Sequence, residues 1–280
     1  MNSVKTVLLL GAMSGLLLAG GQAFGGERGL VMGLGLAIAM NFFSYFFSDK
    51  MALTMYQAQP VSPEKNVEVW NRIAPMTQEL CRRMEIPMPK LWVLPEQSPN
   101  AFATGRNPQH ASVAVSAGLL QLMDDREVEG VIAHELGHVL HRDILISSIA
   151  ATIAAAITFI ARSAMWFGGG HRDDENRGSA WGGILMLILA PIAAMLIQMA
   201  ISRTREYSAD AAAAKYTGSP DGLISGLSKL ENWSKRIPMD ASPATAHMFI
   251  IQPFSGESLM RLFSTHPRTE DRIAALRQAA

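Results

Sequence analysis

The sequence has 280 residues, of which 24 are basic and 24 acidic, and this balance gives no reason to expect nucleic acid as a partner. Charged residues make up only 17% of the chain, where about a quarter is usual for a soluble protein, so long stretches must lack charge. The single cysteine, Cys81, excludes an internal disulfide and a cysteine-based metal cluster, and we expect it to fill space on a helix.

Four long apolar segments account for the low charge, at 6–26, 29–48, 144–167 and 178–202, with Arg162 the single charge inside them. Each meets or approaches the roughly 20 residues that a helix needs to span a bilayer. A domain of this size does not need four buried helices of this kind, so the pattern predicts an integral membrane protein. The first segment, preceded by Lys5, also resembles a secretory signal peptide, but the second span follows almost at once, which favours a retained hairpin.

The two hairpins predict that the rest of the chain lies on one side of the membrane. The links within them, at 25–29 and 168–180, are short, so segments 49–143 and 203–280 must emerge together. Basic residues near the span ends are Lys5, Lys50, Arg142, Arg203 and Arg205 on that side, against Arg28, Arg162, Arg172 and Arg177 on the other. This small excess favours a cytoplasmic domain under the positive-inside rule.

After the first hairpin the pattern changes from helical to extended. Apolar residues recur at helical spacing over 63–85, where Pro75 predicts a kink or two shorter helices. Residues 90–94 and 112–116 are typical of short strands. A further extended candidate between them contains Asn100, Ala101, Phe102, Ala103 and Thr104. It could be an ordinary hairpin strand or an edge strand that binds a substrate backbone by strand addition, and the pattern favours neither.

The segment 131–140 contains the motif H-E-x-x-H, which indicates metal chemistry. His134 and His138 are four residues apart, so on a helix both imidazoles lie on one face and can reach a single ion. Asp124 or Asp125 can cap that helix. Glu135 is placed to take a proton from water at the metal rather than to bind the ion. Zinc accepts imidazole and carboxylate ligands, so we expect one zinc ion per chain.

Because so short a motif also arises by chance on buried helices, the interpretation depends on a third ligand elsewhere in the chain. Glu206 could complete a His, His, Glu set, and Asp210, one helical turn later, could hold the outer N–H of a ligand histidine. His141 is a rival, but it lies roughly 10 Å along the axis from His134, too far to share one ion easily. Glu206 could instead be an exposed partner of a neighbouring arginine.

After the fourth span, the sequence predicts helices over 206–216 and 221–235, then a loop over 238–256 with a possible strand at 248–251. A last helix should begin at Pro267, with Glu270 and Asp271 in its first turn. His266 immediately precedes it. A histidine in such a position is usually a solvent-facing cap, and its spacing does not show whether it reaches the site.

In this order, the motifs resemble those of the HtpX-type membrane zinc metallopeptidases, relatives of the CAAX prenyl proteases. The resemblance covers an N-terminal hairpin, 100–105, 134–138, an inserted hairpin, 206–210, and 264–267 followed by Arg272 and Ile273. It implies a bacterial inner-membrane endopeptidase with a cytoplasmic active site that acts on misfolded or damaged membrane proteins. It also implies Glu206 as third zinc ligand, Asp210 as partner of a ligand histidine, 100–104 as substrate edge and His266 as a catalytic residue near the reaction centre.

The expected fold is mainly α: a multi-pass helical membrane protein with four spans and an α+β zincin-like metallopeptidase domain split by a transmembrane hairpin. Its divisions are the hairpin 1–48, the first part of the domain at 49–143, the inserted hairpin 144–202 and the second part at 203–280. If the zinc helix runs straight into the third span, the metal lies roughly 10 Å above the membrane surface, which favours membrane proteins cut near the bilayer.

A non-catalytic zinc-containing membrane chaperone or scaffold, and a transporter, are the alternative functions. An intact Glu135 beside an open coordination position favours the enzyme. The lipid bilayer and membrane-protein substrates are the expected partners, and the sequence leaves the oligomeric state open.

Overall fold

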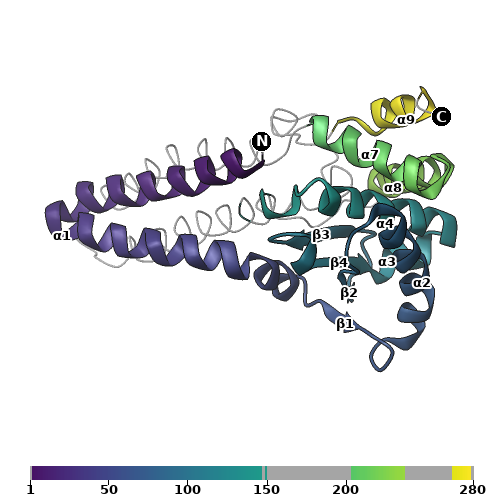
Figure 1. Ribbon diagram of the computed structural model, residues 1–280, viewed down its shortest axis with the longest axis horizontal. Helices are drawn as coiled ribbons and strands as arrows, with labels where there is room; N and C mark the ends of the chain where they lie inside the picture. The colour runs from purple at the N-terminus through teal and green to yellow at the C-terminus, as the bar shows by residue number, and fades with distance from the viewer. Residues whose placement is uncertain (1, 147–148, 150–202, 237–266, 279–280) are drawn as a thin grey trace.

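The chain begins with α1, Asn2–Met55, two helical arms joined at a break (Figure 1). The computed structural model describes residues 2–146, 149, 203–236 and 267–278. Gly26 has φ 56° and ψ −140°, which glycine adopts without a steric penalty, and there the chain reverses. The two arms run antiparallel, and the Asn41 amide donates a hydrogen bond of 2.9 Å to Ser14 Oγ between them. A helical hairpin with its turn inside 25–29 is therefore present, as predicted.

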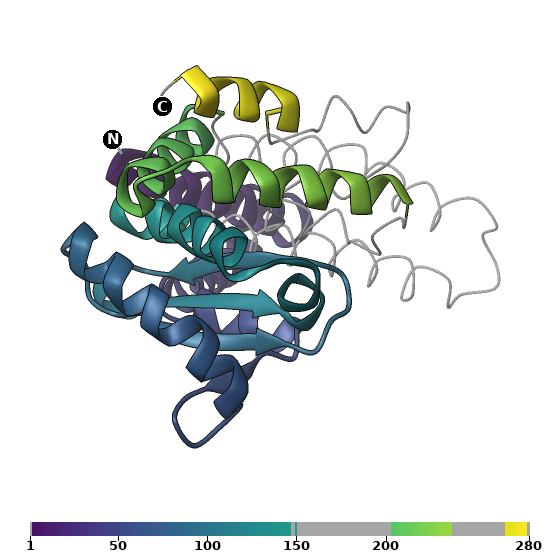
Figure 2. The same cartoon turned by 90° about the vertical axis from the view of Figure 1, so that its right-hand side faces the viewer.

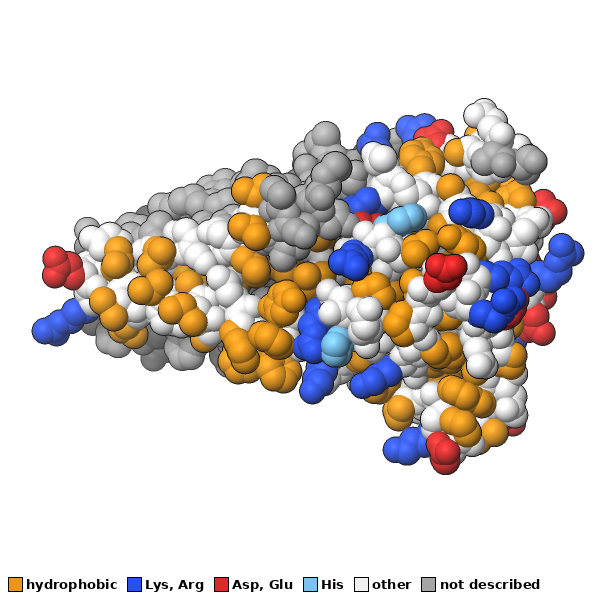
Figure 3. All heavy atoms as spheres, in the orientation of Figure 1, with side chains coloured by type: hydrophobic (Ala, Val, Ile, Leu, Met, Phe, Trp, Pro, Cys, Tyr) orange, Lys and Arg blue, Asp and Glu red, His pale blue; other side chains and the backbone are white. Residues whose placement is uncertain are grey.

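The second arm contains a segment that is long and apolar enough to cross a membrane, Gly26–Phe47, with 22 residues and a mean hydropathy of 1.8. Its apolar side chains are largely exposed, including Val31 at 67% and Met32 at 75%. Along the arms of α1 in Figure 3 the coloured side chains are mainly hydrophobic, with charged ones at the tip of the hairpin, whereas charged and hydrophobic side chains are mixed over the described part of the domain. So much exposed apolar surface indicates a lipid environment. The expected third and fourth spans lie almost entirely outside the described residues, so four spans stay a prediction.

A four-stranded sheet follows, in the order β1-β2-β4-β3. Its strands are β1, Gln59–Val61, β2, Lys90–Leu94, β3, Ala101–Gly105, and β4, Ala111–Ser116. β2 and β4 are parallel, and the other two pairs are antiparallel. The strands predicted at 90–94 and 112–116 are confirmed, while the three-residue β1 was not predicted. β3 is joined to β4 through the 3-10 helix η1, Pro108–His110, so among the described residues it is both a hairpin strand and the edge of the sheet.

The helix α2, Val67–Met84, packs its apolar side against the sheet and the following helices. It runs without interruption through Pro75, so the two-helix alternative is wrong, and it begins four residues later than predicted. Pro75 lies on the exposed side, where the backbone carbonyl that loses its hydrogen bond can be solvated. Cys81 is 3% exposed in the core, as expected for a space-filling cysteine.

The helix α4, Asp125–Leu140, lies at the centre of the domain. It follows the short α3, Ala117–Leu122, and its N-cap is Asp124, which forms a capping box with Glu127 at 3.0 and 2.9 Å. One side of α4 covers the sheet, and the other meets α7, Arg203–Thr217, and α8, Asp221–Arg236 (Figure 2). Gly137 allows the close approach of α7, because a Cβ there would lie 3.0 Å from Ala209 Cα.

The end of α4 corrects one expectation. The helix does not run straight into the third span, because Arg142 adopts a left-handed conformation with φ 58° two residues after the helix ends. The Asp143 N–H then donates to the His138 carbonyl at 2.9 Å, and the Arg142 N–H to the Val139 carbonyl at 3.1 Å, as in a Schellman motif. Residues 144–146 are helical again after this turn. The 10 Å estimate, which assumed a straight helix, no longer applies.

The last turn of α1 covers the other face of the sheet. Ala52 and Leu53 are buried against Leu94 and Phe102, and the Tyr56 and Phe102 rings lie 5.4 Å apart. The second arm of α1, which carries the candidate span, is thus packed directly against the edge strand β3.

The C-terminal helix α9, Thr269–Gln278, packs on α7 and α8. It begins two residues after Pro267, and Glu270 and Asp271 lie in its first turn, as predicted. The predicted helices at 206–216 and 221–235 are confirmed as α7 and α8. His266 and the predicted loop 238–256 with its strand at 248–251 lie outside the described residues.

Candidate functional site

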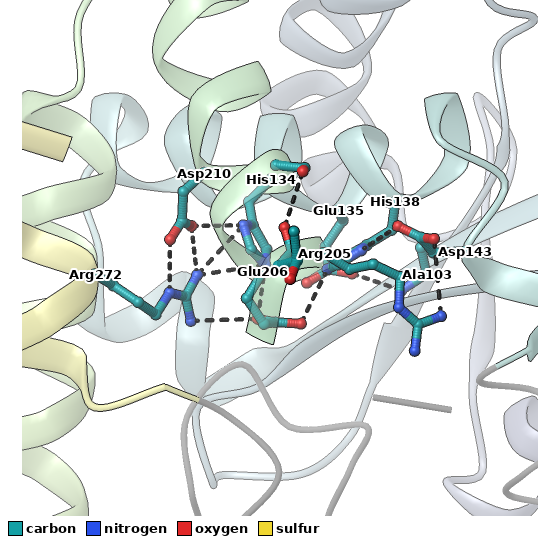
Figure 4. A network of polar contacts seen from close by, with 11 residues as sticks. Ala103, His134, Glu135, His138, Asp143, Arg205, Glu206, Asp210 and Arg272 are labelled. Carbon is teal, nitrogen blue, oxygen red and sulfur yellow. Dashed lines mark hydrogen bonds and ion pairs between the residues drawn. The ribbon is translucent and has the colours of Figure 1, made fainter. Parts of the chain in front are cut away.

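Three donor side chains converge where α4 and α7 cross (Figure 4). His134 and His138 come from α4, and Glu206 comes from the first turn of α7. Glu206 Oε2 lies 3.7 Å from His134 Nε2, and Glu206 Oε1 lies 3.6 Å from His138 Nε2. Glu206 is only 5% exposed, so its alternative role as an exposed partner of an arginine is wrong. The structure brings the three predicted ligands together, with one ligand atom from each within 4.8 Å of the others.

The donor set fits a metal ion of the zinc type. Two ligands about 2.0–2.1 Å from zinc at a tetrahedral angle are roughly 3.4 Å apart, close to the separations between Glu206 and the two histidines. Two imidazoles and one carboxylate leave a fourth position for water. The rival ligand His141 is exposed at the C-cap of α4 and is not part of this group.

Each histidine has a carboxylate behind it. His134 Nδ1 lies 2.9 Å from Asp210 Oδ1, and His138 Nδ1 lies 3.4 Å from Asp143 Oδ2. A carboxylate at Nδ1 favours the tautomer that carries its proton there, so that the Nε2 lone pair points toward the donor group. The contact of Asp210 was predicted, but that of Asp143 was missed. A residue five positions after His138 on a continuous helix would be rotated roughly 140° away from it, and only the left-handed turn brings it back.

Arg272 is a buried member of the site that sequence reasoning missed as a functional residue. It reaches in from α9, is 1% exposed, and donates to Asp210 from Nε at 2.8 Å and from Nη2 at 2.6 Å. Its Nη1 lies 3.7 Å from Glu206 Oε2. Burial alone would raise the pKa of Asp210, but the charge and hydrogen bonds of Arg272, with the contact to His134, lower that pKa to about 2. The sequence offered a weak signal, a charged residue four positions before the buried Leu276 on one helical face.

Glu135 connects the donor group to the edge strand. The carboxylate is 5% exposed, and its Oε2 accepts a hydrogen bond of 2.8 Å from the Ala103 N–H. Burial raises the pKa of Glu135, and the nearby histidine charges oppose that rise only in part. The Ala103 N–H therefore points toward α4 and the Glu135 carboxylate, beside the donor group. Asn100, just before the strand, is fully buried, and its side-chain amide has no hydrogen-bond partner in the part of the chain that the structure describes.

The charges around the two histidines are mainly negative. Burial alone would lower the pKa of His138, but the hydrogen bond with Asp143 and the charges of Glu206 and Glu135 raise it to about 9. In the part of the chain that the structure describes, four carboxylates surround the histidines, against the two guanidinium groups of Arg205 and Arg272 (Figure 4). Such an environment favours a bound cation.

Comparison with known proteins agrees with this geometry. Residues 68–280 match the profile of peptidase family M48. A protease HtpX homologue from Desulfatibacillum aliphaticivorans is 55% identical to the chain, over 98% of this chain and 89% of that protein. Another, from Nostoc punctiforme, is 50% identical over 98% of this chain and 95% of its own length. Among solved structures, S. mikatae Ste24p has a TM-score of 0.47 at 18% identity, over 98% of this chain and 65% of that one.

The family profile thus spans every part of the site, from the edge strand through α4 and α7 to Arg272. The HtpX homologues extend the similarity through the N-terminal hairpin as well. The resemblance noted in the sequence is confirmed, and the chain belongs to peptidase family M48 as a membrane metallopeptidase.

Proposed function

We propose that the chain is a zinc endopeptidase that cuts misfolded or damaged membrane proteins at the cytoplasmic face of a bacterial inner membrane. The observation that carries this proposal is the position of Glu135. Its carboxylate follows the first donor histidine in the sequence and lies 2.8 Å from the backbone N–H of Ala103 on the edge strand. A general base, three metal donors and an edge strand that could bind a peptide are the parts that metal-dependent peptide hydrolysis uses.

His134, His138 and Glu206 would hold the zinc ion. When bound, zinc supplies a Lewis acid that polarises a carbonyl oxygen and lowers the pKa of water toward neutrality. Asp210 contacts His134 Nδ1 and would hold its imidazole so that Nε2 is free to bind the metal. Arg272 in turn donates two hydrogen bonds to Asp210, so the carboxylate that contacts His134 is itself held in place.

The edge strand β3 would bind the substrate as an added strand. The Ala103 N–H points away from β4, since Glu135 accepts its hydrogen bond. A peptide that pairs with this edge through its backbone passes close to the Glu135 carboxylate. Backbone pairing leaves most substrate side chains unread, so we expect loose sequence preference. Residues 100–104 would provide this edge through their backbone groups.

Glu135 would move the proton in both halves of the reaction. Its oxygen takes a proton from the attacking water and then delivers a proton to the leaving amine nitrogen. The raised pKa that burial gives Glu135 suits a group that must both accept and release a proton near neutral pH. His266, which precedes the buried Pro267, would donate to the developing oxyanion, and the loss of one such donor typically costs on the order of 100-fold in turnover.

The position of the second arm of α1 supports membrane-protein substrates that are cut close to the bilayer surface. α1 carries the candidate span and packs its last turn on β3. The two predicted spans at 144–202 are flanked in the sequence by Asp143 and by Arg205, which both belong to the site. A metallopeptidase domain held in this way acts close to the lipid surface, and four spans would complete its anchoring.

The test is cleavage of an unfolded protein by the full chain in detergent, with zinc measured in the same samples. Glu135→Gln should retain the metal and lose nearly all peptidase activity, because the general base is removed while the three ligands remain. A chelator should abolish cleavage by the wild type, and Glu68→Gln, an exposed glutamate on α2, serves as the control.

Comparable cleavage by Glu135→Gln would mean that the base is wrongly assigned. A wild type that binds zinc and prevents aggregation without cutting would instead support the chaperone.

A further inference from the structure

The turn after α4 places Asp143 beside the donor histidine His138. Arg142 lies in the left-handed region, and the two backbone hydrogen bonds from Arg142 and Asp143 close the end of the helix. Such turns usually have glycine or asparagine at the left-handed position, because a side chain there costs conformational energy. The chain nevertheless makes the turn with arginine. The turn reverses the backbone so that Asp143 returns beneath its own helix instead of continuing along it.

The reversal brings the Asp143 carboxylate to the back of His138. Asp143 Oδ2 lies 3.4 Å from His138 Nδ1, and the Asp143 side chain is 4% exposed. The contact has the same form as that between Asp210 and His134, at 2.9 Å. The two histidines therefore each have one carboxylate at Nδ1, one supplied by α7 and the other by the turn.

The second oxygen of Asp143 faces the other helix of the site. Asp143 Oδ1 lies 3.8 Å from Arg205 Nη1, and the Arg205 side chain is 12% exposed. Arg205 directly precedes Glu206, so this ion pair links the end of α4 to the beginning of α7 (Figure 4). A single carboxylate thus contacts one donor histidine and the neighbour of the donor glutamate.

We propose that Asp143 is a positioning residue. It holds His138 with Nε2 toward the metal and fixes the end of α4 relative to the beginning of α7. The proposal rests on the proposed function only in requiring a metal at His134, His138 and Glu206. Loss of a carboxylate behind a ligand histidine typically lowers metal affinity by 10- to 100-fold. Asp143→Asn removes the charge and keeps the shape, so we expect zinc affinity to fall within that range.

The experiment measures zinc affinity of the detergent-solubilised full chain by competition with a chromophoric chelator. The variants are Asp143→Asn and Asp125→Asn. Asp125 is the first residue of α4 and pairs with Arg72, but its side chain is 73% exposed and lies at the opposite end of the helix from Asp143. Asp125→Asn should bind zinc like the wild type. The visible spectrum of the cobalt-substituted protein should change for Asp143→Asn only, since it reports the geometry around the ion.

The outcomes separate this proposal from the proposed function. A wild type that takes up no zinc would reject the metal site itself. A wild type that binds zinc, with Asp143→Asn binding within twofold and giving an unchanged cobalt spectrum, would overturn the role of Asp143 and leave the enzyme standing. A second measurement needs no variant: proton and nitrogen NMR of the zinc-loaded wild type should find the His138 Nδ1–H shifted downfield from a solvent-exposed imidazole N–H, because Asp143 accepts its hydrogen bond. An unshifted Nδ1–H would overturn the proposal even if Asp143→Asn failed to fold.

Discussion

Replacement of Arg272 by methionine should destabilise the metal-free protein more than any exposed arginine substitution. Methionine fills a similar volume but leaves the Asp210 carboxylate, 2% exposed, with His134 as its polar contact and without the two Arg272 hydrogen bonds. A buried charge that loses its partner costs far more than the pair contributes, because the charge stays desolvated.

The magnitude follows from the burial of both partners. Removal of one partner of a buried ion pair costs about 3–5 kcal/mol. The pKa of Asp210, about 2 against 3.8 for an ordinary aspartate, gives an estimate of the same order, about 2–3 kcal/mol. Because this pKa is lowered in the folded state, the stabilisation is present above about pH 4 and is lost as the pH falls toward 2. For a domain of this size, about 3–5 kcal/mol lowers the melting temperature by roughly 6–20 °C.

The assay is thermal unfolding in detergent, followed by circular dichroism with a chelator present, so that metal binding does not contribute. Arg82→Met is the matched control, because Arg82 also pairs with a glutamate, at 2.8 Å, but its side chain is 72% exposed. An exposed pair contributes at most about 1 kcal/mol. The double variant Asp210→Asn with Arg272→Met should recover part of the loss, since the unpaired charge is gone. A melting temperature of Arg272→Met equal to that of Arg82→Met would refute this reasoning.

Two further predictions concern the core and the topology. Cys81 is buried, and burial raises the pKa of its thiol to about 11, so iodoacetamide at neutral pH should label it only after unfolding. Rapid labelling of the native protein, seen by mass spectrometry, would contradict the packing of α2. A reporter active only in the periplasm should be active when fused after Asp174 and inactive after Ala280. The opposite pair of results would show that the protein has the reverse orientation in the membrane.

The sequence was sufficient to predict the elements whose structure depends on local composition and periodicity. α4 and α8 follow from the spacing of their apolar residues, and α7 from its run of helix-forming alanines. The convergence of His134, His138 and Glu206 follows from helical spacing with the need for a third donor. The edge position of β3 could not be decided from its own residues, because strand order depends on long-range pairing.

Asp143 and Arg272 were missed as site residues for a different reason. The contact of Asp143 depends on one left-handed residue, Arg142, which is unusual for an arginine and has no signature in the periodicity. The role of Arg272 depends on how α9 docks on α7, about 60 residues later in the chain than Asp210. Side chains that support a site from distant elements can therefore be identified only from the structure.

Tyr56 packs on Phe102, and Ala52 and Leu53 are buried in the same cluster, so the end of the second arm of α1 is docked directly on β3. The candidate span ends at Phe47 and the helix at Met55, so roughly 12 Å of helix separates the end of the span from the sheet. If that span lies in the bilayer and β3 binds substrate as proposed, this length would set the height of the cleaved bond above the lipid, so peptide bonds would be selected by height rather than by the side chains beside them. An unfolded segment of a membrane protein at that height would then be cut whatever its sequence, and a thicker or thinner bilayer would shift the line of cleavage along the substrate.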